Sequence, residues 1–255
     1  MGRSSWKIRI FIGLAIVAFA FIKRCSSKEE NPYTGRVQTI NMTAEQEIAI
    51  GLQSTPEIAQ QYGGLYPDER LQAYVDKVGQ KLVQNSIARE TLYHYDFHLL
   101  ADDQTINAFA LPGGPIFITY ALFKQLNEAQ LAGVLGHEIG HVIGRHSAER
   151  IAEGEFWQTL STGASVGGDL GGLVGGIGQN TLLSNGRDDE LESDDLGVLF
   201  MIQTGYRPEE MIKVMEILKA AAGPNRAPEF QSTHPDPENR IERIQESISK
   251  YRNQQ

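Results

Sequence analysis

The sequence predicts a mainly helical α+β domain with one small β-sheet. Most of the chain from residue 43 onward carries apolar residues at three- and four-residue intervals, which is typical of helices. One stretch, residues 92–100, alternates apolar and polar side chains and indicates a strand. A second strand, Ile116 to Thr119, is expected after a Pro-Gly-Gly turn, and Pro115 before it suits an edge strand or the start of a strand.

Composition narrows the possible partners. The chain has 255 residues, enough for one domain with a substantial core. Its formal net charge of −9 and isoelectric point near 5.2 predict that nucleic acid is not a partner. The only cysteine, Cys25, excludes an intramolecular disulfide and a cysteine-rich metal site.

Residues 1–24 are expected to form a signal or membrane-anchor segment. Basic residues precede a run of uncharged, mostly apolar residues from Ile10 to Ile22. As a helix this run spans about 20 Å, less than the roughly 30 Å hydrocarbon core, so Trp6 and the flanking basic side chains would have to extend it. A lipidated Cys25 and a buried core helix are the alternatives. Both main interpretations export the remaining chain, so we expect an extracytoplasmic, periplasmic-side location with membrane attachment through this segment.

The polar residues 25–42 are expected to be a linker, and residues 43–255 the main domain. Thr43 and Asn127 are each followed three positions later by glutamine, a capping-box pattern that predicts a helix start. We expect the glycine-rich residues 162–180 to be flexible or closely packed. Further helices are expected near 68–83, 187–205 and 207–223, and at the C-terminal end.

The stretch HEIGH at residues 137–141 predicts a zinc site. His137 and His141 lie four apart, so their imidazoles leave one helix face and can converge on one ion per chain. Glu138 lies about 100° around the helix, where it can reach a water at the metal and act as general base. Glycines recur along this helix at 133, 136, 140 and 144, and we expect a neighbouring element to pack closely on them.

The third metal ligand has two candidates. His146 follows closely, but it falls one position before the histidine of the H-E-x-x-H-x-x-G-x-x-H pattern. The acidic run DDELESDD at 188–195 offers carboxylates instead, unless it is only a solvated helix start. In this run Glu190 and Asp194 share a helix face, so Glu190 could bind the metal while Asp194 accepts a hydrogen bond from a ligand imidazole.

Four stretches occur in an order that resembles the HtpX/BepA-like zinc metallopeptidases, the group that includes the CAAX prenyl endoprotease. They are NAFALPGG at 107–114, HEIGH at 137–141, ELESDD at 190–195 and THPDPENRI at 233–241. The resemblance implies an HExxH metallopeptidase domain of the gluzincin type. It also implies that Glu190 is the third zinc ligand and that Asp194 supports a ligand histidine. Ser193 stands where this family usually has alanine.

The expected function is that of a zinc-dependent endopeptidase acting on extended or unfolded polypeptides in envelope quality control. A sheet edge beside the site would pair with the substrate backbone. The expected substrate-binding residues are Asn107, Gly113, Gly114 and Ile116.

Two further residues belong to the matching C-terminal stretch. His234 or Arg240 could stabilise the tetrahedral oxyanion as part of the catalytic set. Alternatively, neutral His234 could occupy the open zinc position and keep the enzyme inactive. A different class of function is a zinc-stabilised binding or chaperone-like module for unfolded envelope proteins. The presence of Glu138 favours the enzyme over that alternative.

Overall fold

The computed structural model describes residues 3–168, 170–221, 234 and 239–254. The chain divides into two units. Unit 1 comprises Met1–Met42 and Ser147–Gly186, and unit 2 comprises Thr43–His146 and Arg187–Gln255. Every residue that the sequence assigns to the site lies in unit 2.

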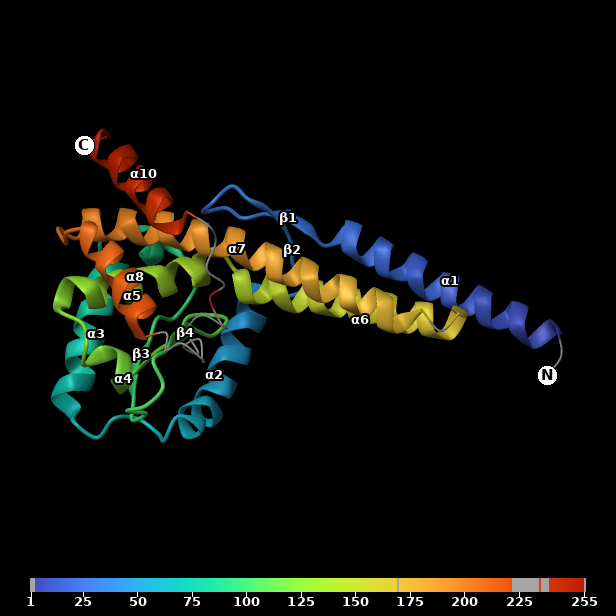
Figure 1. Cartoon of the computed structure of the whole chain (residues 1–255), viewed down its shortest axis with the longest axis horizontal. Helices are drawn as coiled ribbons and strands as arrows, with labels where there is room; N and C mark the ends of the chain where they lie inside the picture. The colour runs from blue at the N-terminus through green and yellow to red at the C-terminus, as the bar shows by residue number, and fades with distance from the viewer. Residues whose placement is uncertain (1–2, 169, 222–233, 235–238, 255) are drawn as a thin grey trace. The chain divides into compact units, whose positions relative to one another are not determined.

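Unit 1 consists mainly of packed helices. It contains α1 (Arg3–Ser26), the antiparallel strands β1 (Lys28–Glu30) and β2 (Val37–Thr39), most of α6 (His146–Gly168) and the first half of α7 (Gly171–Gln203). Helix α1 lies alongside α6 (Figure 1). The two backbones are in direct contact at Gly13 and Gly163, since a Cβ on Gly13 would lie only 2.6 Å from the Gly163 carbonyl oxygen. The glycine-rich segment is therefore helical on both sides of residue 169 and closely packed at Gly163.

Two ion pairs tie α1 to α6 near the end of α1. Lys23 pairs with Glu155 at 2.8 Å and Arg24 with Glu153 at 2.6 Å. Toward its start α1 exposes large apolar side chains, such as that of Phe11. Across the part of the chain that the structure describes, no helix, α1 included, has the length and apolarity needed to span a membrane.

Unit 2 is organised around α5 (Glu128–Ile143). The predicted start at Asn127 is confirmed, with Gln130 completing the capping box. Every residue from Gln130 to Ile143 is buried, because α3 (Glu69–Gln84), α8 (Glu209–Ala221) and two strands contact this helix (Figure 1). A helix buried on all sides is normally apolar all round, so its polar residues require partners in the interior.

The glycines of α5 let α7 approach at backbone distance. A Cβ on Gly140 would lie 2.9 Å from the Cα of Ser193, and one on Gly136 would lie 3.4 Å from the Cα of Gly197. The close packing predicted for these glycines is therefore confirmed. It also explains why a small residue, Ser193, stands opposite Gly140, and it brings the acidic run of α7 beside the HExxH face.

The sheet of unit 2 has three strands in the order β3-β5-β4, namely β3 (Phe97–Leu100), β5 (Ile116–Thr119) and β4 (Ala108–Ala110). β5 pairs parallel with β3 and antiparallel with β4. Two predictions are wrong here. The strand expected over 92–100 begins only at Phe97, and the strand containing Ile116 is central rather than an edge. The reason is that the Pro-Gly-Gly turn folds β4 back onto β5 as a hairpin, so β4 forms the edge.

The hairpin turn requires its two glycines. Gly113 and Gly114 have φ of 81° and 128°, values that side chains other than glycine rarely adopt. A Cβ on Gly114 would lie 2.1 Å from the His94 carbonyl oxygen, and one on Gly113 would lie 2.4 Å from the Cα of Ile48 in α2 (Ala44–Gln61). Both glycines are buried and shape the turn, and their contact with substrate stays a prediction.

The remaining elements complete the core of unit 2. Helix α2 begins with the predicted capping box of Thr43 and Gln46. The 3-10 helix η1 (Ile87–Glu90) and the short α4 (Tyr120–Phe123) connect the strands and helices. α7, α8 and α10 (Arg240–Arg252) share a cluster of buried apolar side chains: Val198, Met201, Met211, Ile244 and Ile248.

Candidate metal centre

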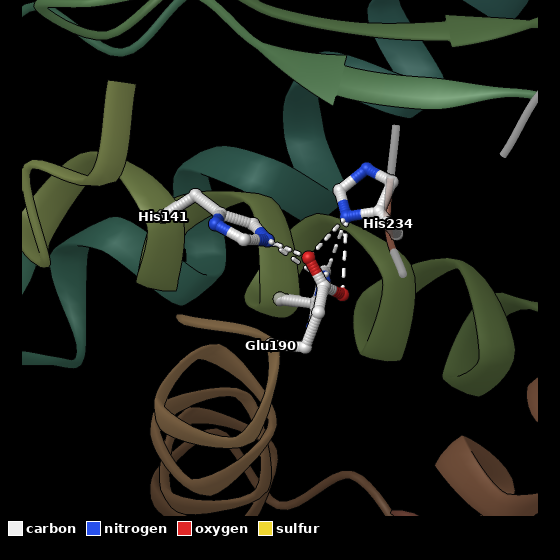
Figure 2. Close-up of side chains that lie close together, drawn as sticks. His141, Glu190 and His234 are labelled. Carbon is white, nitrogen blue, oxygen red and sulfur yellow. Dashed lines mark hydrogen bonds and ion pairs between the residues drawn. The ribbon is translucent and has the colours of Figure 1, made fainter. Parts of the chain in front are cut away.

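Four buried residues from three parts of the chain form a group that could hold one metal ion. His137 and His141 come from α5, Glu190 from α7, and His234 from the segment between α8 and α10. One ligand atom from each lies within 4.8 Å of all the others, and Figure 2 shows Glu190 between His141 and His234. The structure thus brings together the three expected ligands and adds His234.

The carboxylate of Glu190 bridges the imidazoles. Its Oε2 lies 3.2 Å from His137 Nε2, and its Oε1 lies 3.3 Å from His141 Nε2 and 3.0 Å from His234 Nδ1. The Nε2 atoms of His137 and His141 are only 3.0 Å apart. Each histidine therefore directs one ring nitrogen at a common point.

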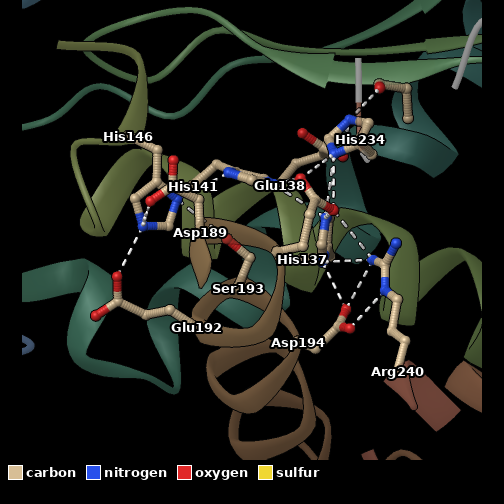
Figure 3. A network of polar contacts seen from close by, with 12 residues as sticks. His137, Glu138, His141, His146, Asp189, Glu192, Ser193, Asp194, His234 and Arg240 are labelled. Atoms are coloured by element: carbon tan, nitrogen blue, oxygen red, sulfur yellow. Dashed lines mark hydrogen bonds and ion pairs between the residues drawn. The ribbon is translucent and has the colours of Figure 1, made fainter. Parts of the chain in front are cut away.

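In two of the histidines, the partner of the ring nitrogen that faces away from the cluster shows which nitrogen carries the proton. His137 Nδ1 lies 2.8 Å from Asp194 Oδ1, and His234 Nε2 lies 3.1 Å from the carbonyl oxygen of Ala108 (Figure 3). Both partners only accept, so these nitrogens donate, and in a neutral ring the nitrogen facing the cluster is left with a lone pair. Ligand histidines in metal proteins have this arrangement.

The donor set fits a transition metal ion. Three imidazoles and one carboxylate are the ligand types that such ions take, and the Nε2 atoms of His137 and His141 face the same point, 3.0 Å from each other. Burial alone would raise the pKa of Glu190, but the histidines around it outweigh burial and hold that pKa well below its usual value. The carboxylate is therefore ionised and available to a cation.

Arg240 supports the carboxylates of α7. Its Nε lies 2.6 Å from Asp194 Oδ2 and its Nη2 lies 2.9 Å from Asp194 Oδ1, a bidentate pair. The same Nη2 lies 3.3 Å from Glu190 Oε2. Burial would raise the pKa of Asp194, and Arg240 outweighs it and lowers that pKa. These contacts support a role in holding Asp194 and Glu190, while the oxyanion role of Arg240 stays a prediction.

Glu138 stands apart from this network. It is fully buried, yet neither carboxylate oxygen has a hydrogen-bond partner among the described residues, and the nearest cation candidate, His234 Nε2, is 3.6 Å from Oε1. Burial raises the pKa of Glu138. A buried carboxylate without a hydrogen bond is costly to the fold, so its place beside the cluster indicates a partner supplied by water or substrate.

The sheet edge that borders the site is β4. Asn107, just before β4, is fully buried, and its carbonyl accepts a hydrogen bond from Thr119 N at 3.0 Å. Ile116 is buried in the central strand, which already pairs with β3 and β4, and its contact with substrate stays a prediction. Ala108, by contrast, directs its carbonyl to His234. The prediction that an edge strand borders the site is thus confirmed, with β4 in place of β5.

His146 does not belong to the group of ligand atoms. Its Nδ1 contacts His141 Nδ1 at 2.8 Å, on the side of that ring facing away from the cluster. Sequence reasoning missed this contact, although a histidine five residues after a ligand and next to Gly144 was the available signal.

Comparison with known proteins agrees with this geometry. The model of the family described as peptidase family M48 matches residues 69–248. The beta-barrel assembly-enhancing protease of Escherichia coli (strain K12) is 32% identical over 191 residues, covering 69% of this chain and 39% of that protein. The protein of the same name in Yersinia pestis is 31% identical over 224 residues, covering 82% and 45%. The mitochondrial metalloendopeptidase OMA1 of Schizosaccharomyces pombe is 29% identical over 241 residues, covering 91% and 70%.

A buried HExxH helix joined by a carboxylate from a later helix defines a metallopeptidase. The chain belongs to peptidase family M48. The resemblance to HtpX/BepA-like enzymes is thereby confirmed. The chain covers about two fifths of the length of the assembly-enhancing proteases that it matches.

Proposed function

We propose that this protein is a zinc-dependent endopeptidase that cleaves extended or unfolded polypeptides. The observation that carries the proposal is the buried carboxylate of Glu138 beside the ligand cluster, which has no hydrogen-bond partner among the described residues. His137, His141 and Glu190 would hold one zinc ion. Bound zinc supplies Lewis-acid polarisation of the scissile carbonyl and a lowered pKa for water.

Glu138 acts as general base and then as general acid. It takes the proton of the attacking water and passes it to the leaving amine. Burial raises its pKa, which brings the carboxylate closer to the range where it can both accept and return a proton near neutral pH. Asp194 and Arg240 keep His137 oriented during these steps.

The substrate binds to β4 as an additional strand. The Asn107 carbonyl accepts a hydrogen bond from Thr119 of β5, and the Leu111 amide donates one to Pro115. Because bonding to one neighbour alternates along a strand, the backbone N–H and C=O of Ala108 point away from β5. The Ala108 carbonyl is then free to pair with the backbone of an extended peptide once His234 leaves it. Pairing of this kind depends on backbone hydrogen bonds rather than on particular side chains, and only an extended segment has its backbone groups available. This supports selectivity for unfolded segments.

His234 fits the inhibitory role better than the oxyanion role. Its Nδ1 lies 3.0 Å from Glu190 Oε1 and 3.3 Å from His137 Nε2, so it occupies a fourth ligand position. A substrate carbonyl needs that same position. His234 therefore keeps the site closed until substrate displaces it.

Replacing Glu138 tests the hydrolytic mechanism. We expect Glu138→Gln to lose casein cleavage by at least about 100-fold, the usual contribution of a general base, while bound zinc stays near one per chain. Proteolysis assays and metal analysis on the same preparation measure both. Full activity in the variant would refute the mechanism. A wild-type protein that binds zinc and suppresses aggregation without any cleavage would support the chaperone-like module instead.

Replacing His234 separates its two possible roles. If His234 closes the site, His234→Ala should cleave casein faster than the wild type at equal zinc content. If it stabilises the oxyanion, the same variant should be slower by about 100-fold. Initial rates at saturating casein decide between them, and a slower variant would overturn the inhibitory role.

The proposed setting is the cell envelope. The basic and apolar segment at residues 1–24 supports export and attachment on the periplasmic side, and relatives named beta-barrel assembly-enhancing protease support a role in envelope protein quality control. Fractionation of cells that express the full chain tests the location. Recovery in the cytosolic fraction would contradict it.

A further inference from the structure

His146 is held by several polar partners in the interior of unit 2. It is only 1% exposed. Its Nδ1 lies 2.8 Å from His141 Nδ1, and its Nε2 lies 2.7 Å from Glu192 Oε2 (Figure 3). The hydroxyl of Ser193 also lies 3.3 Å from His146 Nδ1. The ring thus connects a metal-facing histidine to a carboxylate on α7.

The direction of these hydrogen bonds follows from the carboxylate. Glu192 only accepts, so His146 Nε2 donates, and Nδ1 of the neutral ring is left as an acceptor. Two ring nitrogens 2.8 Å apart share one proton, so His141 Nδ1 must donate to His146. The Nε2 of His141, which faces the cluster, is therefore the nitrogen that carries the lone pair.

The backbone is shaped to place His146 there. Arg145 has φ of 55°, a left-handed conformation that is uncommon outside glycine, and it ends the turn after α5. Its guanidinium pairs with buried Glu47 of α2 at 2.6 Å, which supports this conformation. A Cβ on Gly144 would lie 2.3 Å from His146 Nε2, so only glycine leaves room for the ring.

We propose that His146, backed by Glu192, is a positioning residue for His141. The chain Glu192–His146–His141 fixes the tautomer and the orientation of the ligand ring. It does for His141 what Asp194 does for His137 and what the Ala108 carbonyl does for His234. This role rests on the proposed metal site, and partners of this kind usually contribute 10- to 100-fold in metal affinity.

The test compares replacements at one position. His146→Leu keeps comparable volume without an acceptor, whereas His146→Asn offers an amide oxygen near the place of Nδ1. The matched control is His98→Leu, because His98 is a partly buried histidine of β3 whose ring contacts that of Phe117 outside the cluster. Zn²⁺ affinity is measured by competition with a chromophoric chelator. Thermal unfolding of the metal-free proteins verifies that each variant is folded.

We expect His146→Leu to bind Zn²⁺ about 10- to 100-fold more weakly than the wild type. His146→Asn should regain most of that loss, and the His98 control should match the wild type. Equal affinity of the leucine variant and the wild type would overturn the inference, and so would equal losses for leucine and asparagine. A wild-type protein that binds no Zn²⁺ would instead refute the proposed function.

Discussion

At the scale of single residues, His137 determines the charge of the metal-free site. Burial lowers the pKa of this histidine, but hydrogen bonds to Asp194 and Glu190 outweigh burial and raise the pKa to about 10. At neutral pH the metal-free ring is therefore protonated on both nitrogens. The nitrogen that faces the cluster must lose its proton before it can bind a metal ion.

The raised pKa predicts that metal binding depends on pH. Below about pH 10 His137 is protonated without metal and deprotonated with it, so raising the pH favours the metal-bound form. We expect Zn²⁺ affinity to rise about tenfold per pH unit between pH 6.5 and 9, with about one proton released per ion. Calorimetry in two buffers of different ionisation enthalpy measures the proton count, and an affinity independent of pH would contradict the prediction.

At the scale of elements, the site depends on how closely α7 approaches α5. His137 and His141 lie on one helix and Glu190 on the other, with Gly140 and Ser193 at the point of contact. An extra methyl group there has to push the helices apart. Glu190 would then move away from the two imidazoles.

Gly140→Ala therefore should weaken both the fold and the site. The new Cβ would lie 2.9 Å from the Ser193 Cα, and overpacking of this kind usually costs about 1–3 kcal/mol. The matched control is Gly154→Ala in α6, where nothing lies within 4 Å and alanine should stabilise the helix by up to about 1 kcal/mol. Urea unfolding and Zn²⁺ competition measure the two effects. An unchanged affinity in the Gly140 variant would refute the role of this contact.

Helix α2 is linked to the end of α5 by one buried ion pair. Glu47 accepts from Arg145, and Tyr93 lies 3.4 Å from the same carboxylate. Glu47→Ala leaves the guanidinium without this partner in the interior, so we expect a loss of about 3–5 kcal/mol in the free energy of unfolding. Exposed Glu45 in the same helix provides the control, because Glu45→Ala should change the free energy of unfolding far less than Glu47→Ala. Similar losses in both variants would contradict the prediction.

The elements also show what the sequence could predict. Capping boxes and helical periodicity identified the starts of α2 and α5, and the four-residue spacing of Glu190 and Asp194 placed both on one face. Strand β4 was missed because Ala-Phe-Ala is too short for alternation to show. The contact of His146 with His141 was missed because a continuous helix would place a residue five positions on away from that face. Only the left-handed turn at Arg145 brings it back.

At the scale of the whole molecule, a bound metal ion would join parts of the chain that are distant in sequence. The ligands come from α5, α7 and the segment before α10. These parts come together only in the folded chain, so the ion binds the folded chain in preference to the unfolded one. Its binding free energy is then added to the stability of the fold.

Removing the metal should therefore lower thermal stability. At free zinc 1,000 times above the dissociation constant, the stabilisation is about 4 kcal/mol. We expect the melting temperature of the zinc-loaded protein to fall on dialysis against a chelator and to recover when zinc is added. Calorimetric scans of the same sample in the three states measure this, and a melting temperature that does not change would show that metal and fold are not coupled.

The position of Arg240 in the chain affects when the site is completed during synthesis. Its buried guanidinium holds Asp194 and Glu190 in place, yet it follows His137 by 103 positions in the chain. At about 5–20 residues per second, a ribosome makes the HExxH helix several seconds before it makes this arginine. Until this arginine has been made, the acidic groups of α7 lack its counter-charge, and the peptidase site is incomplete. The order of translation thus delays the ability to cut until nearly all of the domain has been made.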